Sequence, residues 1–300
     1  MITRPMLAVD AGDITKLRYP RIASAKLDGI RCLKLNGKAL SRSFKPIPNE
    51  YVRYMIENSG LPNGVDGELV LRDGSPFNKV SSAIMSQEGS PDYVYKIFDY
   101  VVNGNIREPF IDRYHRLQDG LPLPRNFAEY LVHIVVDNSR ELAEFEEAWI
   151  SQGYEGVITR TIDSPYKCGR STLKEQYMLK LKRFVDSEAI VIGWEEMERN
   201  TNPAFVGELG QTKRSHASEG KIGAKLVGAL IVEDIKTHIV HKLGSGFTMD
   251  DRASLYEMAM QGAFEKDRGW VVTYKYQLHG VVEKPRSPIF KGIRHILDMV

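Results

Sequence analysis

Cysteine is scarce in this chain, since only Cys32 and Cys168 occur among its 300 residues. Two cysteines in a chain of this length fit neither a disulfide framework nor the ligand spacing of a metal site, and they favour a reducing compartment. The chain also lacks any uninterrupted run of 18 apolar residues and has no apolar stretch at its N-terminus. We therefore expect a cytoplasmic protein that neither spans a membrane nor is secreted.

A large net charge is absent as well, because 41 Lys and Arg residues nearly balance 39 Asp and Glu residues. The distribution of charge is more informative than this sum. Residues 167–183 contain six basic residues and a single acid, Glu175. Two later segments are also enriched in basic side chains: Lys213, Arg214, His216, Lys221 and Lys225 in one, and Lys284, Arg286, Lys291, Arg294 and His295 in the other. One such run is often only a solvated face, but three of them favour a phosphate-rich partner.

The composition, with 42% apolar and 27% charged residues, is that of a folded globular protein, and 300 residues suffice for two domains. In the first part, Gly29 is expected to join two strands as a hairpin, and Asn49 and Asn138 are expected to open helices. The expected strands cover 21–26, 30–36, 65–71, 93–102, 155–160 and 176–183, with a further helix around Phe77, Val80 and Ile84.

After residue 185 the pattern changes to short strands at 189–194, 227–233, 238–243 and 270–276, with one helix between Asp250 and Phe264. Such a set is typical of a small barrel such as the OB-fold. Residues 199–222 lack periodicity, which predicts either a long loop or an inserted hairpin. The sequence therefore predicts two domains, residues 1–185 and 186–300.

Five charged motifs follow one another in the first domain, each within or beside an expected strand. They are Lys26-Leu27-Asp28-Gly29, Asp66-Gly67-Glu68, Ile97-Phe98-Asp99, Glu155-Gly156 and Leu179-Lys180-Leu181-Lys182-Arg183. In the last motif the lysines alternate with leucines, so both ammonium groups should project from one face of a strand. Each motif is common by itself, but the five in this order are hard to obtain by chance.

The ordered set resembles the covalent nucleotidyltransferases, above all the ATP-dependent DNA ligases of the compact phage type. The resemblance implies an α+β fold: an adenylyltransferase domain (an ATP-grasp-like nucleotidyltransferase domain of antiparallel sheets with helices) followed by an OB-fold β-barrel. It implies an enzyme that seals 5′-phosphate/3′-hydroxyl nicks in duplex DNA. ATP donates its AMP to a lysine, and this AMP then passes to the DNA 5′-phosphate. The 3′-hydroxyl finally attacks that phosphate and displaces AMP.

The same resemblance assigns roles to individual residues. Lys26 is the expected nucleophile, and it must lose its proton before it can attack phosphorus. The other expected ATP- or AMP-binding residues are Arg31 and Glu68 at the ribose, Phe98 stacked on the adenine, Lys180 and Lys182 at the α-phosphate, and Arg42 at the nucleotide or the nick phosphate. Glu155, together with Glu68, is the expected ligand of Mg²⁺ or Mn²⁺, because Mg²⁺ commonly takes only one or two protein carboxylates.

The sequence departs from the family pattern in two places. A basic final motif of the R-x-D-K type is not clearly present, and only Arg286, Lys291 and Arg294 are candidates for it. Twenty-five residues precede Lys26, so we expect no large N-terminal DNA-binding domain. A monomer should then grip nicked duplex DNA with its two domains, using these three residues and Lys213, Arg214, Lys221 and Lys225.

Three other functions remain open from the sequence. An mRNA capping guanylyltransferase would share the lysine motif and the OB domain but would use GTP. An RNA ligase would share the first domain and generally lack this OB domain. A nucleotide-sensing or DNA-binding protein without activity would not need Lys26, Glu68, Glu155, Lys180 and Lys182 together.

Overall fold

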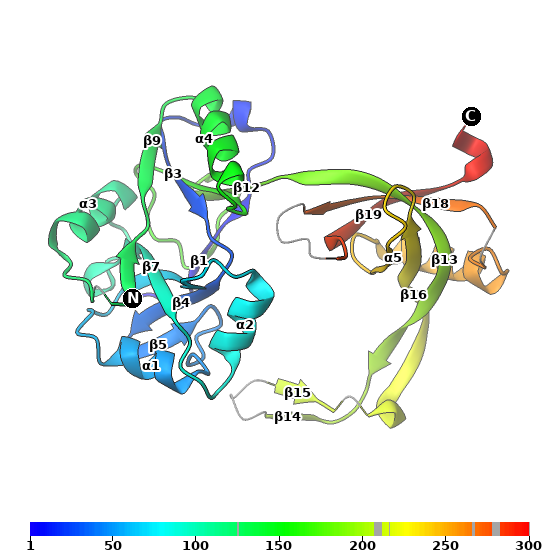
Figure 1. Ribbon diagram of the computed structural model, residues 1–300, viewed down its shortest axis with the longest axis horizontal. Helices are drawn as coiled ribbons and strands as arrows, with labels where there is room; N and C mark the ends of the chain where they lie inside the picture. Colours follow the sequence, from blue (N-terminus) through cyan, green and yellow to red (C-terminus); the bar gives the residue numbers. More distant parts are fainter. Residues whose placement is uncertain (125, 207–211, 216, 266–267, 278–282, 300) are drawn as a thin grey trace. The chain divides into compact units, whose positions relative to one another are not determined.

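The computed structural model describes residues 1–124, 126–206, 212–215, 217–265, 268–277 and 283–299. The chain divides into two compact units, Met1–Lys182 and Arg183–Val300. Figure 1 shows the first unit in blue to green and the second in green to red. None of the described helices is long and apolar enough to cross a membrane.

One five-stranded sheet of the first unit has the order β2-β12-β10-β3-β9. Its strands are β2 (Val9–Asp10), β12 (Met178–Lys182), β10 (Gly156–Thr161), β3 (Arg21–Lys26) and β9 (His133–Val136). Helix α4 (Ser139–Ser151) packs on this sheet through Leu142, which is buried with Val157 and Leu179. The helix begins where the sequence predicted, because the Asn138 side chain accepts a hydrogen bond from the Glu141 N–H at 3.0 Å.

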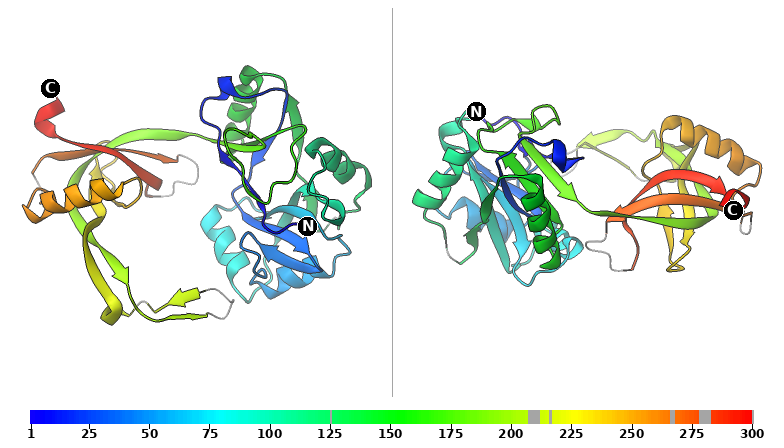
Figure 2. Two further views of the ribbon diagram at one scale, coloured as in Figure 1. Left: turned by 180° about the vertical axis from the view of Figure 1, so that it is seen from behind. Right: turned by 90° about the horizontal axis from the view of Figure 1, so that it is seen from above.

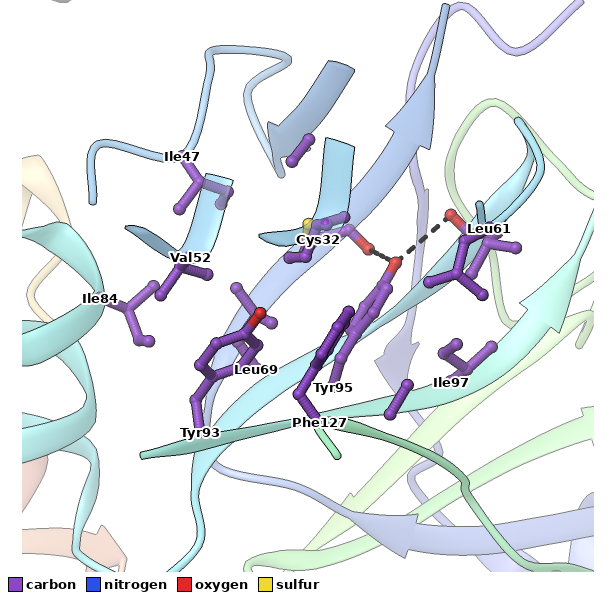
Figure 3. Packing of buried hydrophobic residues seen from close by; sticks show 14 of the residues in the cluster. Cys32, Ile47, Val52, Leu61, Leu69, Ile84, Tyr93, Tyr95, Ile97 and Phe127 are labelled. Atoms are coloured by element: carbon purple, nitrogen blue, oxygen red, sulfur yellow. Dashed lines mark hydrogen bonds between the residues drawn. The ribbon is translucent and has the colours of Figure 1, made fainter. Parts of the chain in front are cut away.

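The second sheet of the first unit has the order β5-β4-β6-β7-β8. It comprises β5 (Lys38–Ser41), β4 (Ile30–Leu35), β6 (Val65–Leu71), β7 (Tyr93–Tyr100) and β8 (Ala128–Tyr130). Figure 3 shows its core, where Val52 of α1 (Glu50–Glu57) and Ile84 of α2 (Phe77–Met85) face the sheet. The Tyr95 hydroxyl crosses this core and donates to the Cys32 carbonyl at 2.9 Å, which satisfies a buried polar group.

The chain also forms short elements that the sequence did not predict. Helix α3 (Phe110–Gly120) contacts β7, and β1 (Met6–Leu7) runs parallel to β11 (Gly169–Arg170). The N-terminal segment therefore lies beside the strand that follows residue 168, far from it in sequence.

The predicted hairpin of residues 21–36 is wrong, although both of its strands form. Strand β3 pairs with β10 and β9 in the first sheet, whereas β4 pairs with β5 and β6 in the second. Five of the six β3 residues are buried, so β3 is a central strand with neighbours on both sides. The chain passes between the sheets at Gly29, where a Cβ would lie 2.3 Å from the Leu69 carbonyl oxygen. Glycine therefore permits close approach of two strands at this position.

The second unit is built on one sheet with the order β17-β16-β13-β18-β19. The strands are β13 (Phe184–Asn200), β16 (Lys221–Asp234), β17 (Val240–Leu243), β18 (Trp270–Gln277) and β19 (Arg286–His295), with α5 (Met249–Met260) between β17 and β18. Ser245, which follows β17, forms an isolated parallel bridge with Ile289 of the edge strand β19. In the described residues the OB-like domain that the sequence predicted is thus one sheet that curls toward closure without forming a closed barrel.

The described residues of the 199–222 segment pair as strands of an inserted hairpin, the second of the two predicted alternatives, and residues 207–211 and 216 lie outside the described residues. Strands β13 and β16 continue as a ribbon in which Asn200 lies opposite Lys221. Beyond them, β14 (Ala204–Val206) pairs antiparallel with β15 (Thr212–Arg214). Figure 2 shows this green-to-yellow ribbon from two further sides.

Candidate active site

A cavity of about 260 Å³ lies in the first unit, and both sheets contribute to its walls. The structure brings seven of the predicted residues to this cavity: Lys26, Arg31, Arg42, Glu68, Phe98, Lys180 and Lys182. Glu155 lies directly behind them, with only 5% of its surface exposed. The five sequence motifs therefore converge on one pocket.

Two rows of side chains cross the first sheet and form the floor of this pocket. Strand pairing places Lys180, Ile158, Ser24 and His133 opposite one another on β12, β10, β3 and β9. The neighbouring row holds Lys182, Gly156 and Lys26. Residues opposite each other in a sheet point to the same face, which explains why Lys26 and both strand lysines share the cavity.

Gly156 allows β10 and β12 to approach closely in the second row, between Lys26 and Lys182. Its φ is +151°, and a Cβ at this position would lie 2.1 Å from the Leu181 carbonyl oxygen. A side chain would therefore push β10 away from β12 and separate Lys26 from Lys182.

The Glu155 carboxylate is held between two lysines. Its Oε2 accepts a hydrogen bond from Lys26 Nζ, and its Oε1 forms an ion pair with Lys182 Nζ. Burial and the nearby charge of Lys26 lower the pKa of Lys182, although the pairing with Glu155 opposes this change. The site is therefore a compact cluster with one more positive than negative charge.

Lys180 and two arginines lie nearer the pocket's edge. Lys180 Nζ is 3.3 Å from the Asp10 carboxylate, which is brought there by the pairing of β2 with β12. Arg42 is exposed and lines the pocket. Arg170, one of the six basic residues of the 167–183 run, also lines it and donates to the Ala8 carbonyl at 2.6 Å. Both arginines are suited to bind phosphate oxygens.

Arg31 and Phe98 form the wall supplied by the second sheet. The Arg31 guanidinium makes a two-pronged ion pair with Asp66, with N–O distances of 2.5 and 2.6 Å, and lies 4.5 Å from the centre of the Phe98 ring. Tyr166 donates to the same Asp66 carboxylate at 2.7 Å. Arg31 is thus fixed in place by Asp66, a residue of the second motif to which the sequence gave no role.

Glu68 differs from Glu155 because no described residue donates a hydrogen bond to its carboxylate. It is half-buried on the pocket wall. Burial raises the pKa of Glu68 to about 7, and the positive charges of Arg31 and Lys26 only partly oppose that rise. It is therefore the carboxylate best able to accept a new partner from a ligand.

Behind Phe98 lies a charged network that the sequence did not reveal. Asp99 accepts hydrogen bonds from Arg113 and Arg160, and all three side chains are at most 2% exposed. Arg160 also lines the pocket, while its Nε has no hydrogen-bond partner among the described residues. These arginines come from α3 and β10, which no local pattern connects to the Asp99 motif.

The described residues contain no cluster of three or more His, Cys, Asp or Glu side chains that could hold a metal ion. A Mg²⁺ ion that brings its own phosphate and water ligands needs only one or two carboxylates. Glu68 fits this requirement as it stands. Glu155 fits it only when Lys26 or Lys182 releases one of its oxygens.

The residues predicted to bind DNA all belong to the second unit, and most have acidic or carbonyl partners. Lys221 lies 3.1 Å from Glu198, Lys291 lies 2.9 Å from Asp186, and Arg294 pairs with Glu188. Arg214 donates to the Asn202 carbonyl, and Lys225 is exposed. Lys213 lies on β15 opposite Phe205, and Arg286 lies on β19 opposite Gln277.

Comparison with known proteins matches this arrangement in both units. Residues 5–182 match the family model of the ATP dependent DNA ligase domain, and residues 219–294 match that of the DNA ligase OB-like domain. The DNA ligase of Sulfolobus acidocaldarius is 28% identical over 296 residues, which cover 88% of this chain and 46% of that protein. The DNA ligase of Thermococcus fumicolans is 27% identical and likewise covered over 46% of its length. The chain thus spans less than half the length of these curated relatives.

Solved structures give longer matches. A Chlorella virus DNA ligase-adenylate is 30% identical, with a TM-score of 0.54, and the match covers 98% of this chain and 100% of that one. A Lig E DNA ligase, 24% identical, has a TM-score of 0.68 with the same coverage of both chains, and it supports the fold alone. With both domains matched and the five motifs gathered in one pocket, the chain belongs to the family of ATP-dependent DNA ligases.

Proposed function

We propose that this protein seals nicks in duplex DNA through a covalent lysyl-AMP intermediate. The observation that carries the proposal is the position of Lys26 in a pocket whose floor presents Lys180 and Lys182 on the same face. Lys26 Nζ attacks the α-phosphorus of ATP, and the bond to pyrophosphate breaks. AMP then passes to the 5′-phosphate at the nick, and attack by the 3′-hydroxyl forms the phosphodiester bond and releases AMP.

The proton on Lys26 is the first obstacle to this reaction. An ammonium group has no lone pair with which to attack phosphorus, so Lys26 must first give up its proton. Glu155 Oε2 is the acceptor that already holds a hydrogen bond from Lys26 Nζ, so it is placed to take the proton. Lys182 and Lys180 then stabilise the negative charge on the phosphoryl oxygens, as positioned cations do in phosphoryl transfer.

The rest of the pocket orients the nucleotide. Phe98 offers an apolar ring to the adenine, and Arg31 and Glu68 lie where a ribose could be held. Mg²⁺ or Mn²⁺, held by Glu68 and by Glu155, would add positive charge beside the phosphates. Arg42 and Arg170 would bind the nucleotide phosphates or the 5′-phosphate of the nick.

Nicked duplex DNA is the proposed partner, bound by a monomer in the cytoplasm. Arg214, Lys221 and Lys225, together with Lys213, lie on the ribbon and hairpin of the second unit and would contact DNA phosphates. Arg286, Lys291 and Arg294 lie together on β19 and form the second candidate surface. The buried thiol of Cys32 and the free thiol of Cys168 suit a reducing compartment.

A labelling experiment tests the proposal. The protein is incubated with Mg²⁺ and α-³²P-labelled ATP or GTP, separated on a denaturing gel, and then chased with a nicked duplex. We expect covalent label from ATP only, transfer of the label to the nick, and a sealed product. Label from GTP alone would indicate a capping-type guanylyltransferase, and no label from either nucleotide would indicate a binding protein without this activity.

A further inference from the structure

His133 ends the row of pocket residues that begins at Lys180. The row crosses three inter-strand spacings of about 4.8 Å, or roughly 14 Å. Lys180 occupies one end, where phosphates would lie, and His133 occupies the other. The start of β9 is tied to the strand that carries Phe98, because the Leu131 N–H donates to the Ile97 carbonyl at 2.8 Å. His133 thus shares the aromatic end of the pocket with Phe98.

The hydrogen bonds of His133 determine its tautomer. Its Nδ1 lies 2.8 Å from the Leu131 carbonyl oxygen, which can only accept, so Nδ1 carries the proton. Burial and the neighbouring Arg160 cation lower the pKa of His133 to about 3 and keep the ring neutral. Its Nε2 is therefore a hydrogen-bond acceptor, and no described residue donates to it.

We propose that His133 is a specificity-determining residue that selects a 6-amino purine over a 6-oxo purine in this pocket. The inference rests on the proposed function, because it assumes that the base of the donor nucleotide lies beside Phe98. The 6-amino group of adenine donates a hydrogen bond, which His133 Nε2 accepts. The 6-oxo group of guanine or hypoxanthine would place a second acceptor against that nitrogen, and both lone pairs would lose their solvent partners.

The residue opposite His133 cannot provide the same selection. Ser24 lies across from it on β3 and also lines the pocket. A hydroxyl can either donate or accept, so Ser24 tolerates either base. The neutral imidazole with a fixed Nδ1 proton cannot change its role, and this difference assigns the discrimination to His133.

A purely structural role for His133 makes a different prediction. The ring also packs against Tyr114, at a centroid distance of 4.6 Å, and against Phe110, at 5.5 Å. If packing were its only role, substitutions would lower stability and the yield of active protein. They would not alter the ratio of rates with two purine nucleotides, because misfolded protein reduces both rates equally.

The first experiment uses the unaltered protein and three labelled donors: ATP, inosine triphosphate, and purine riboside triphosphate, which has hydrogen at position 6. The rate of formation of the covalent enzyme–nucleotide is measured at subsaturating nucleotide. We expect ATP to exceed inosine triphosphate by about 10- to 100-fold, with purine riboside triphosphate between them. Equal rates with ATP and inosine triphosphate would overturn the role of His133 without affecting the proposed function. Failure to form any covalent product would instead overturn the proposed function.

The second experiment uses three variants. In His133→Gln the amide can present an N–H₂ donor to a 6-oxo group, and the ratio of ATP to inosine triphosphate rates should fall about tenfold. In His133→Phe the rate with ATP should fall with no gain for inosine triphosphate. Val135→Ala, on the same strand and 53% exposed, is the matched control and should keep the original ratio. An unchanged ratio in both His133 variants would overturn the proposal. If both variants fail to fold, equal rates with ATP and inosine triphosphate in the unaltered protein would still overturn it.

Discussion

The two units differ in how far their basic side chains are buried and in how firmly these are held by acidic partners. The pocket lysines (Lys26, Lys180 and Lys182) stand on β3 and β12, the two strands that flank β10 in one sheet, and two of them share the almost fully buried Glu155. The ribbon cations (Arg214, Lys221 and Lys225) extend from a two-stranded ribbon and its hairpin. Among them, Lys221 pairs with a half-exposed glutamate, and Lys225 is exposed to solvent.

This difference separates two uses of positive charge. A buried ion pair is costly to break, because removal of one partner leaves the other charged and desolvated. It fixes atoms to the accuracy that phosphoryl transfer needs. Exposed pairs contribute little to stability and exchange partners freely, which suits binding to a repeating phosphate backbone. Substitutions in the buried cluster should therefore have larger effects than substitutions on the exposed ribbon.

The largest effect is expected from Lys26→Ala, which removes the proposed nucleophile. Formation of enzyme–AMP and the sealing of nicks with ATP should fall on the order of 10⁴-fold or more. Joining of a DNA supplied already adenylated should survive, because that step needs no lysyl-AMP. The check is a gel assay with both substrates, and normal ATP-dependent sealing by the variant would contradict the mechanism.

Substitution of Glu155 by Gln tests whether the buried charge matters more than the shape. The amide fills the same space but cannot balance Lys26 and Lys182 or take a proton. Formation of enzyme–AMP should slow by about 10²- to 10³-fold, with the fold retained. Measurement across a range of Mg²⁺ concentrations separates two roles. If Glu155 is a ligand of Mg²⁺, high Mg²⁺ should partly restore the rate of the variant. If Glu155 serves only as the counter-ion of Lys26 and Lys182, high Mg²⁺ should not restore it. Wild-type rates at ordinary Mg²⁺ would show that neither role is important.

Asp99→Asn tests the buried network behind Phe98. It leaves Arg113 and Arg160 without a buried counter-charge and should lower the free energy of unfolding by about 3–5 kcal/mol. Asp186→Asn, which breaks the exposed pair with Lys291, is the matched control and should cost under about 1 kcal/mol. Equal decreases in chemical denaturation experiments would contradict the contrast between the two units.

The same carboxylate should govern acid stability. Burial opposes ionisation of Asp99, but Arg113 and Arg160 outweigh it and lower the pKa to about 2. The pKa in the unfolded chain is about 3.9, so the stabilisation is complete above that pH and is lost as the pH falls toward 2. Asp99→Asn should therefore flatten the dependence of stability on pH in this range, as measured by denaturation at successive pH values.

The smallest effect is expected from the ribbon cations. Replacement of Arg214, Lys221 and Lys225 by Gln should weaken binding to nicked duplex by about tenfold. The salt slope should fall by up to roughly 3, because each DNA phosphate that the protein no longer neutralises lowers it by about 0.9. Formation of enzyme–AMP should not change. If affinity and salt slope were both unaltered, DNA binding would have to be sought on β19, where Lys291→Gln provides the next test.

Local signals in the sequence predicted local structure well. The caps at Asn49 and Asn138, the strand at 65–71, and the alternation of Lys180 and Lys182 with leucines all depend on neighbours a few residues away. The pairing of β3 does not depend on such near neighbours. A strand followed by a glycine turn can either form a hairpin or cross from one sheet to another. Only its burial on both faces decides between them, and that burial depends on distant strands.

The pocket was likewise predicted only as far as its motifs extend. His133, Arg160 and Arg170 belong to none of them, and they reach the pocket through strand pairing and through the packing of the N-terminal segment. The basic run that contains Arg170 was a usable signal. A lone histidine and a lone arginine gave none, because their importance depends on the side chains opposite them in the sheet.

The cross-strand rows also determine which kinds of sequence change the pocket can tolerate. Side chains alternate between the two faces of a strand, so a shift of β3 by one residue turns Ser24 and Lys26 away from the pocket together. Substitutions at single row positions change one interaction at a time. An insertion or deletion of one residue between Arg21 and Lys26 removes several interactions at once, including those of Lys26, the proposed nucleophile. Length variation among related chains should therefore be tolerated better outside the strands that line the pocket than within them.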